Sequence, residues 1–343
     1  MHQPFPKNLL EFQRRFSDED ACAAYLFERR WPDGFVCPWC GHAKGWALKT
    51  KAHTWECAGC GQQTSITANT VMHRSKLPLT VWFWAAFLLA THSNGISALQ
   101  LSKQLGVTYK TAWLLLAKLR RCLVDPDRSL LDGVVEVDET IIPCRTNDQP
   151  LALPGGRSLK GKIAIAGAVE VRTRTTRKGI KEFAGRVRLK TVKDFTDTSL
   201  IGFVEDHVRY QSTVITDGWT AYDALDGECD LHGNILRPAN FKHVPRTVGA
   251  MAANVLLPWV HRVFANLQRW GLGVYHGLRL KYINSYLDEF VFRFNRRRSR
   301  HAAFDTVLGI AMRRDRVTRK DLMAGSLAPV RPFPLEQDIP FPA

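Results

Sequence analysis

Two pairs of closely spaced cysteines constrain what this chain can fold into. The pairs are Cys37 with Cys40 and Cys57 with Cys60. A glycine follows each pair and permits the tight turn that lets two thiolates face one ion. Thiolates at this spacing favour a structural Zn²⁺ site, and a redox-active pair is the less favoured alternative. The sequence therefore predicts a zinc ribbon over residues 35–65.

The charge of the chain indicates a polyanionic partner. Lysine and arginine number 48, and aspartate and glutamate number 32, which gives a formal net charge of +16. Nucleic acid is the usual partner of such a chain, because neutralised phosphates release counterions; a merely soluble basic protein is the alternative. The most apolar run, 79–90, is too short to span a bilayer, and the first residues lack the apolar core of a signal peptide. We therefore expect a cytoplasmic protein.

Helical patterns flank the predicted ribbon. Residues 1–34 form a helical lead-in that ends in a Pro-Asp-Gly turn, and residues 77–123 form a second helical region. Within the second region, a helix, a glycine-containing turn, a cap at Thr108 and a second helix match a helix-turn-helix. This arrangement would place Tyr109 and Lys110 near the start of a DNA-recognition helix. A plain helical hairpin is the alternative.

Strand patterns begin after residue 130 and predict a mixed sheet with flanking helices. The predicted strands cover 134–138, 163–171, 183–189 and 213–217, and the predicted helices cover 198–208, 254–270 and 281–298. The remaining segments are a loop at 145–162, a basic hairpin tip or disordered excursion at 172–181, and an extended proline-rich tail beyond 328. We expect an α+β, multidomain chain with a catalytic domain at 130–310 and a tail at 311–343.

Two aspartates occupy similar positions in the predicted sheet. Asp138 ends one apolar strand, and Asp217 ends another. Carboxylates at the ends of adjacent buried strands can share divalent ions, and a pair of such ions roughly 4 Å apart supports phosphoryl transfer. Hard oxygen ligands favour Mg²⁺ or Mn²⁺. The alternative is that each aspartate merely caps a turn.

From about residue 35 to about residue 308, the chain resembles the DDE-class insertion-sequence transposases that carry an amino-terminal zinc ribbon (the ISXO-type group). The matching motifs are the two Cys-x-x-Cys pairs, Val135–Thr140, Lys160–Lys162, Gly167–Glu170, Thr216–Trp219 with Tyr222, Gly273–His276, Tyr286–Phe290 and Arg293–Arg297. The resemblance implies an RNase H-like catalytic domain. It also implies that Asp138 and Asp217 are the first two metal ligands.

The third ligand is where this sequence departs from the family. The family usually has Glu or Asn on the helix that precedes the glycine of the Gly-Val-Tyr-His motif, and that position is His261 here. No Asp or Glu occurs between Pro238 and Leu287. We therefore expect a DDH site, because a neutral imidazole can ligate a divalent metal. The alternative is a surface or core histidine in an inactive enzyme.

Two further acids are rivals for a place in this site. Glu139 neighbours Asp138 and would point to the opposite face if its strand continues. Glu289 lies on a later predicted helix, where the spacing favours a pair with Arg293 or Arg297. We expect both acids to support the site from outside the set of metal ligands.

Basic and aromatic residues predict a DNA-binding surface around the catalytic region. The candidates, besides Tyr109 and Lys110, are Lys160, Lys162, Trp219, Arg262, Arg269, Arg296 and Arg297. Trp219 could stack on an unpaired base, together with Tyr222, although packing is the favoured role for both. For any single basic residue, a solvated face is the alternative.

The predicted function is that of a bacterial insertion-sequence transposase. It would bind terminal inverted repeats, hydrolyse a phosphodiester at the element's end and direct the freed 3′-hydroxyl at target DNA. A homo-oligomer is expected because two ends must meet, and no nucleotide cofactor is needed because transesterification conserves bond energy. The alternatives are a transposase-derived DNA-binding regulator with an inactive site and a nuclease that cuts without joining.

Overall fold

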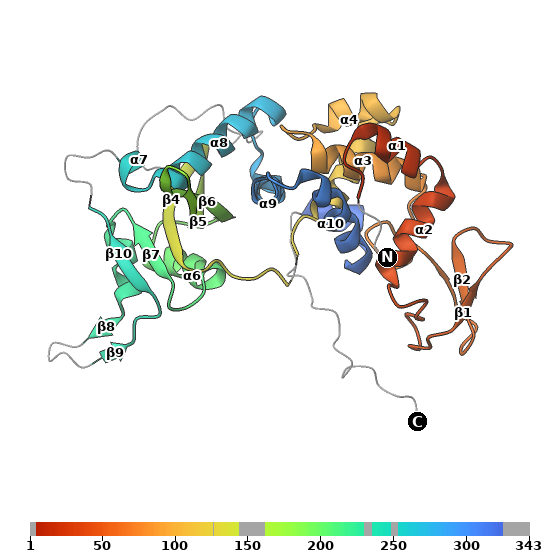
Figure 1. Cartoon of the computed structure of the whole chain (residues 1–343), viewed down its shortest axis with the longest axis horizontal. Helices are drawn as coiled ribbons and strands as arrows, with labels where there is room; N and C mark the ends of the chain where they lie inside the picture. Colours follow the sequence, from red (N-terminus) through yellow and green to blue (C-terminus); the bar gives the residue numbers. More distant parts are fainter. Residues whose placement is uncertain (1–4, 126, 144–161, 230–234, 248–252, 325–343) are drawn as a thin grey trace. The chain divides into compact units, whose positions relative to one another are not determined.

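The computed structural model has two compact units (Figure 1). It describes residues 5–125, 127–143, 162–229, 235–247 and 253–324. The first unit comprises the described residues up to His92, Ala98–Arg128 and those from His301 onward; the second comprises Ser93–Ser97 and Ser129–Arg300. The predicted loop at 145–162, apart from Lys162, and the proline-rich tail lie outside the described residues.

The first unit is mainly helical, as the patterns at 1–34 and 77–123 predict. Its helices are α1 (Leu9–Arg15), α2 (Glu19–Arg30), α3 (Leu79–Thr91), α4 (Ala98–Leu105), α5 (Tyr109–Arg120), α10 (Arg300–Arg313) and α11 (Arg319–Ala324). Asp18 caps α2 by accepting a hydrogen bond from the Ala21 N–H at 2.8 Å. Helix α3 has no cap of its own; the Glu19 carboxylate instead accepts from the N–H groups of Leu79 and Thr80, at 2.7 and 2.8 Å. None of the described helices has both the length and the apolar character needed to cross a membrane.

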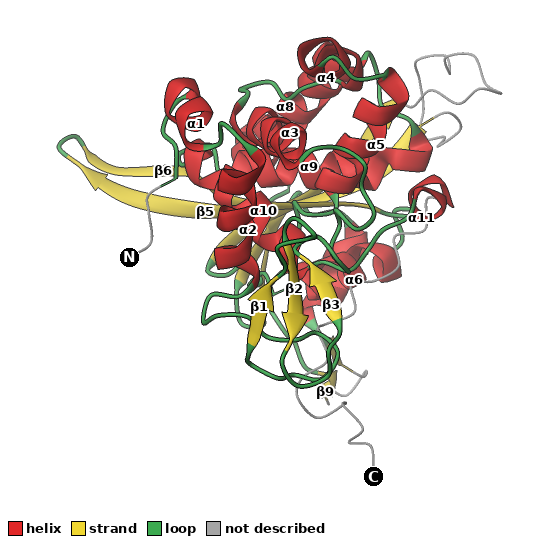
Figure 2. Cartoon of the chain, turned by 90° about the vertical axis from the view of Figure 1, so that its right-hand side faces the viewer, coloured by secondary structure: helices red, strands yellow, loops and turns green. Residues whose placement is uncertain are grey.

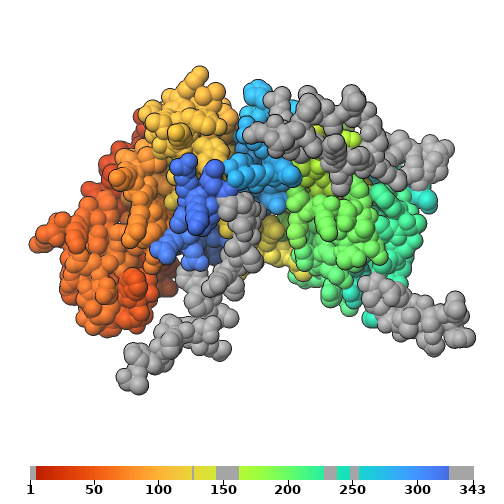
Figure 3. Space-filling view, turned by 180° about the vertical axis from the view of Figure 1, so that it is seen from behind, coloured from red at the N-terminus to blue at the C-terminus, as the bar shows by residue number. Residues whose placement is uncertain are grey.

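An aromatic cluster holds the carboxy-terminal helix α10 against the amino-terminal helices. The Phe304 ring lies 5.5 Å from Phe12 and 5.9 Å from Phe87, centroid to centroid, and Tyr25 donates a hydrogen bond to Asp305. Figure 3 shows the blue atoms of this segment directly against orange ones. Helix α10 thus packs in the first unit from His301 onward, whereas the sequence predicts an end of the catalytic domain at residue 310.

Helices α4 and α5 have the predicted order of helix, glycine turn, cap and helix. Gly106 adopts a φ of +65°, which favours glycine, and the Thr108 side chain accepts a hydrogen bond from the Thr111 N–H at 3.3 Å. Tyr109 and Lys110 lie exposed on the first turn of α5. This turn is therefore accessible to a partner.

The predicted ribbon contains a small antiparallel sheet, which Figure 2 shows below the helices. Its strands, in the order β1-β2-β3, are β1 (Gly45–Ala47), β2 (Thr54–Cys57) and β3 (Gln63–Ser65). Trp55 of β2 packs on Phe27 of α2 with ring centroids 4.9 Å apart. The Arg30 guanidinium donates to the carbonyls of Ser65 and Ala68, at 3.0 and 2.8 Å. The helical lead-in thus forms part of the support of the ribbon.

The second unit is built on a five-stranded mixed sheet. Its strands are β4 (Val134–Pro143), β5 (Lys162–Thr176), β6 (Gly179–Thr191), β7 (Thr213–Thr216) and β10 (Lys242–Pro245), in the order β10-β7-β4-β5-β6. Strands β4, β5 and β6 pair antiparallel, whereas β7 lies parallel to β4 and β10 parallel to β7. A separate pair of short strands is β8 (Glu228–Cys229) with β9 (Ile235–Arg237). The strand predictions are confirmed, but β4 continues five residues past Asp138 because β5 pairs with it along its whole length.

Helices cover both faces of this sheet. One face carries α6 (Asp197–His207) and the 3₁₀ segment η1 (Thr220–Asp226); the other carries α7 (Ala253–Leu256), α8 (Pro258–Tyr275), the 3₁₀ segment η2 (Leu280–Tyr282) and α9 (Ile283–Asn295). At Gly167 of β5, a Cβ atom would lie 2.6 Å from the Phe264 ring of α8, so only glycine allows this close approach. The core therefore fixes where α8 crosses the sheet.

Candidate active site and metal-ligating cysteines

Strand β4 directs alternate carboxylates to opposite faces of the sheet. Glu136 and Asp138 point toward α8, and both are buried, with exposed fractions of 2 % and 6 %. Glu139 points to the other face, where its Oε2 accepts a hydrogen bond from the Tyr222 hydroxyl at 2.8 Å. Tyr222 is itself fully buried, which matches the favoured packing role. Glu139 is therefore held away from the face that carries Asp138.

Glu136 fastens the start of α8 to the sheet. Its Oε2 accepts hydrogen bonds from the N–H groups of Trp259 and Val260, at 2.8 and 2.9 Å. These are two of the groups that a helix start leaves unpaired, and the residue before Pro258 provides no side-chain cap. Burial raises the pKa of Glu136, while the two N–H groups act in the opposite direction. Sequence reasoning misses this residue, although a glutamate within an apolar strand is a usable signal.

The same helix start brings His261 to Asp138. The His261 Nε2 lies 3.3 Å from Asp138 Oδ2, yet it is buried and has no aligned hydrogen-bond partner among the described residues. Burial lowers the pKa of His261, and the nearby charge of Asp217 raises it by a smaller amount. The neutral form of the His261 imidazole is therefore favoured beside the Asp138 side chain. Two adjacent ligands of one octahedral ion stand about 3 Å apart, so this pair of atoms fits a shared divalent cation.

Asp217 lies just past the end of β7, on the strand next to β4. The parallel register pairs Glu136 with Ile215, so its continuation brings Asp217 level with Asp138. The Asp217 Oδ1 accepts from the Trp219 N–H at 3.0 Å, and Gly218 turns the chain with a φ of +79°. The structure thus brings Asp138 and His261 into contact and places Asp217 beside them. Within the described part of the chain, only the four cysteines form a group of three or more ligating atoms all within 4.8 Å of one another.

Like charges surround Asp138. Burial raises its pKa to about 8, and the charges of Glu139, Asp217 and Glu136 act in the same direction. The Glu139 N–H donates to Asp138 Oδ1 at 2.8 Å and opposes the shift only in part. An ionised Asp138 is therefore costly in the protein alone, and a cation would offset that cost.

Glu289 lies on α9 and has a packing role. It is fully buried, and both of its carboxylate oxygens accept from the Tyr275 hydroxyl, at 3.1 and 3.0 Å. Burial lowers the pKa of Arg293, and the charge of Glu289 opposes this, so the two groups interact as the helical spacing predicts. The other predicted partner, Arg297, instead donates to the carbonyls of Ala184, Gly185 and Phe294.

The four ribbon cysteines converge on one point. The Sγ atoms of Cys37 and Cys60 lie 3.7 Å apart, and those of Cys40 and Cys57 lie 3.6 Å apart. All four lie within 4.8 Å of one another. Sulfur atoms around a tetrahedral Zn²⁺, with bonds of about 2.3 Å, stand about 3.8 Å apart. The cluster therefore has the size of a four-thiolate metal site.

The predicted DNA-binding residues lie in different settings. Arg262 and Arg269 are exposed on α8, where the Arg262 guanidinium stacks on Trp259 at 4.8 Å and Arg269 donates to Asn266 at 3.0 Å. The Arg296 guanidinium lies 4.1 Å from the Phe292 ring centroid, and burial lowers the pKa of Arg297. The contacts of Arg297 with three carbonyls leave few donors for DNA and indicate a structural role.

The remaining candidates lie beside the sheet. Trp219 is half-buried, and its ring centroid lies 6.1 Å from that of Phe195. Lys162 is the first residue of β5, whereas Lys160 lies outside the described residues. The proximity of the Phe195 ring indicates a packing role for Trp219.

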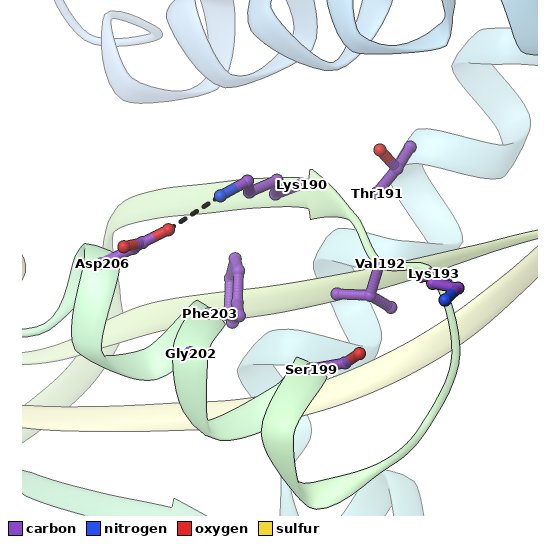
Figure 4. Close-up of a pocket in the computed structure, with 8 residues that line it drawn as sticks. All are labelled: Lys190, Thr191, Val192, Lys193, Ser199, Gly202, Phe203 and Asp206. Carbon is purple, nitrogen blue, oxygen red and sulfur yellow. Dashed lines mark hydrogen bonds and ion pairs between the residues drawn. The ribbon is translucent and has the colours of Figure 1, made fainter.

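A small hollow lies on the opposite face of the sheet, beside α6 (Figure 4). Its volume is about 300 Å³, and Phe203, Val192 and Ser199 contribute to its lining. Lys190 and Asp206 form an ion pair at its edge, with 2.7 Å between Nζ and Oδ2. The hollow is therefore separated by the sheet from Asp138 and His261.

Glu136→Ala is expected to lower the free energy of unfolding by about 2 kcal/mol, because two buried N–H groups at the start of α8 lose their acceptor. Glu136→Gln keeps an acceptor oxygen and should lose less than half as much. Urea denaturation of both variants measures the difference. Equal losses in the two variants would contradict the capping role.

Comparison with known protein families agrees with this architecture. The model of the ISXO2-like transposase domain matches residues 130–295, and that of the transposase zinc-ribbon domain matches residues 17–63. The chain belongs to the insertion-sequence transposases that combine an amino-terminal zinc ribbon with a DDE-type transposase domain. The zinc-ribbon match begins within the lead-in and includes α2, earlier than the predicted start at residue 35.

One similar protein is the "Uncharacterized protein in transposable element ISH50" of Halobacterium salinarum. It is 27% identical over 219 residues, which cover 62% of this chain and 72% of that protein. No solved structure matches the chain. The two domain matches thus show the family.

Proposed function

We propose that this protein is a DNA transposase that binds the terminal inverted repeats of its element and catalyses metal-dependent DNA cleavage and strand transfer. The observation that carries the proposal is the 3.3 Å approach of His261 to Asp138, with Asp217 on the adjacent parallel strand. These residues lie within the matched transposase domain. The strand order, three antiparallel strands followed by two parallel ones, supports an RNase H-like fold for this domain.

Asp138, Asp217 and His261 would hold Mg²⁺ or Mn²⁺. The fit of the site rests on its three donors: two carboxylates and a neutral imidazole whose buried Nε2 has no aligned partner among the described residues. When bound, such an ion supplies activation of water or a hydroxyl and stabilisation of the leaving oxygen. Asp138 must lose its proton to take part, and Glu136 keeps α8 in the position that presents His261.

The ribbon cysteines would hold a structural Zn²⁺, and the ribbon with α4 and α5 would hold the terminal repeat. Arg262 and Arg269 on α8 lie on the same helix as His261, so they can contact phosphates near the reacting bond. Tyr109 and Lys110 occupy the first turn of the proposed recognition helix. Because two element ends must meet, we infer a homo-oligomer on DNA.

A strand-transfer assay tests this proposal. Purified protein is mixed with labelled element ends and a target plasmid, with Mg²⁺ or Mn²⁺, beside an Asp217→Ala control. Joined products that depend on the metal and vanish in the control are expected. Tight, specific end binding with no cutting in either metal would contradict the proposal and support a regulator with an inactive site.

A further inference from the structure

Strands β5 and β6 continue past the sheet as a two-stranded hairpin. The pairing of β5 with β4 ends at Val171, whereas its pairing with β6 runs on from Val171–Ala184 to Thr176–Gly179. Figure 2 shows the two labelled strands extending beyond the rest of the sheet. The sequence predicts a basic hairpin tip or a disordered excursion at 172–181, and the structure shows a paired hairpin there. We call residues 172–183 the basic arm.

The basic arm carries a dense positive charge. It contains five Lys or Arg residues and one acid, Glu182. Arg172 at its base is engaged by Asp132 and Glu170, each at 3.1 Å. The other cations are Arg174, Arg177, Lys178 and Lys181, all exposed. Among the described residues, none of these four has an ion-pair partner, so a net positive surface faces solvent.

The pairing of the arm places two of these cations directly opposite each other. Arg174 pairs with Lys181 across the strands, so their side chains share one face. Thr175 and Ile180 pair on the other face, where Ile180 is 77% exposed. Like charges in a directly opposed pair destabilise a hairpin, and an isolated hairpin is marginal in water. The arm therefore has a charge arrangement that a polyanion would stabilise.

Buried polar contacts hold the base of the arm. Glu170 is buried, and its carboxylate contacts Arg172 and, through Oε2, the Arg186 N–H at 3.1 Å. Burial raises the pKa of Glu170, but hydrogen bonds from Arg186 and Arg172 outweigh it and lower the pKa to about 2. At Gly185, a Cβ atom would lie 2.8 Å from Arg172 Cγ, so the strands are closely packed there. The arm thus leaves the sheet in a defined direction.

We propose that the basic arm binds duplex DNA by its phosphate backbone. A two-stranded hairpin fits the major groove of B-DNA, which is about 12 Å wide, and cations on one face and at the tip can contact phosphates at its edges. This inference rests on the proposed function for its DNA partner. It adds a contact that the ribbon cysteines, α5 and α8 do not provide. The duplex can be the element end or the target, and both offer the same phosphate chemistry.

Binding as a function of salt concentration tests the arm. Two variants remove two charges each: Arg174→Gln with Lys181→Gln, and Arg177→Gln with Lys178→Gln. The matched control is Lys193→Gln with Arg209→Gln, which removes two exposed charges elsewhere in the same unit. Affinities for an element-end duplex and for an unrelated duplex are measured over a range of KCl concentrations, without added Mg²⁺ or Mn²⁺.

Each arm variant is expected to reduce the slope of log Kobs against log salt by about 1.8, because each phosphate that is no longer neutralised lowers the slope by about 0.9. The control pair should reduce the slope by much less. A change on the element end alone assigns the arm to that duplex, and a change on both assigns it to target DNA as well. Unchanged slopes on both duplexes, or an equal change in the control, would overturn the proposal. Wild-type protein that binds neither duplex would contradict the proposed function itself, which separates the two failures.

Discussion

Asp138→Asn is expected to reduce strand transfer by more than about 10³-fold, equivalent to about 4 kcal/mol of transition-state stabilisation. The amide lacks the charge that would hold the proposed divalent ion between Asp138, Asp217 and His261. Binding of the element end should persist, because the ribbon and α5 do not depend on this side chain. The matched control is Asp206→Asn, an exposed aspartate on the opposite face of the sheet. Full activity in the Asp138 variant would contradict its assignment as a ligand.

The same substitution should stabilise the protein when no divalent ion is present at the site. The pKa of Asp138 is raised from 3.8 to about 8, so unfolding releases a proton at any pH between these values. Wild-type stability is therefore expected to fall as the pH rises from about 4 to about 8, and the variant should lack this fall. At pH 8 the free energy of unfolding of the variant should exceed that of the wild type by roughly a few kcal/mol. Added Mn²⁺ should stabilise only the wild type. Thermal unfolding at pH 4 and pH 8 measures both effects.

Removal of the ribbon metal is expected to unfold the ribbon. Metal binding in such sites supplies on the order of 10 kcal/mol of folding free energy, and β1–β3 have little core of their own. Cys57→Ser should lose the bound Zn²⁺, expected at one per chain, and with it binding of the element end. Metal analysis and circular dichroism, with and without a chelator, make the measurement.

A second buried cysteine provides the control for this prediction. Cys122 is fully buried and lies outside the cluster, so Cys122→Ala should lower stability by a packing effect while keeping one metal per chain. A Cys57→Ser variant that keeps its full metal content and binds DNA as tightly as the wild type would contradict the assignment.

The sequence predicts those features that local spacing determines. The cysteine cluster follows from two short motifs, and the cap at Thr108 with the turn at Gly106 follows from local turn chemistry. The strands of the second unit follow from apolar runs. The continuation of β4 past Asp138 does not, because pairing with β5, rather than local composition, extends that strand.

Long-range contacts are not predictable from local patterns. Glu136 caps a helix more than a hundred residues later, and only the folded sheet brings them together. Likewise, α10 follows α8 and α9 in sequence but packs on Phe12 through Phe304. The position of His261 is identified by its alignment with the family's motifs and not by composition. In the structure its Nε2 lies 3.3 Å from Asp138 Oδ2. Its role as a ligand remains a proposal.

We propose that Asp138, Asp217 and His261 form one metal site that drives DNA joining. Its most direct test is strand transfer by His261→Ala and His261→Glu, with end binding measured in parallel. Glutamate is one of the two residues, Glu or Asn, that the resemblance implies at this position of α8. We predict that the alanine variant binds the element end but does not join it, and that the glutamate variant joins it with Mg²⁺ or Mn²⁺. Undiminished joining by the alanine variant would contradict the claim.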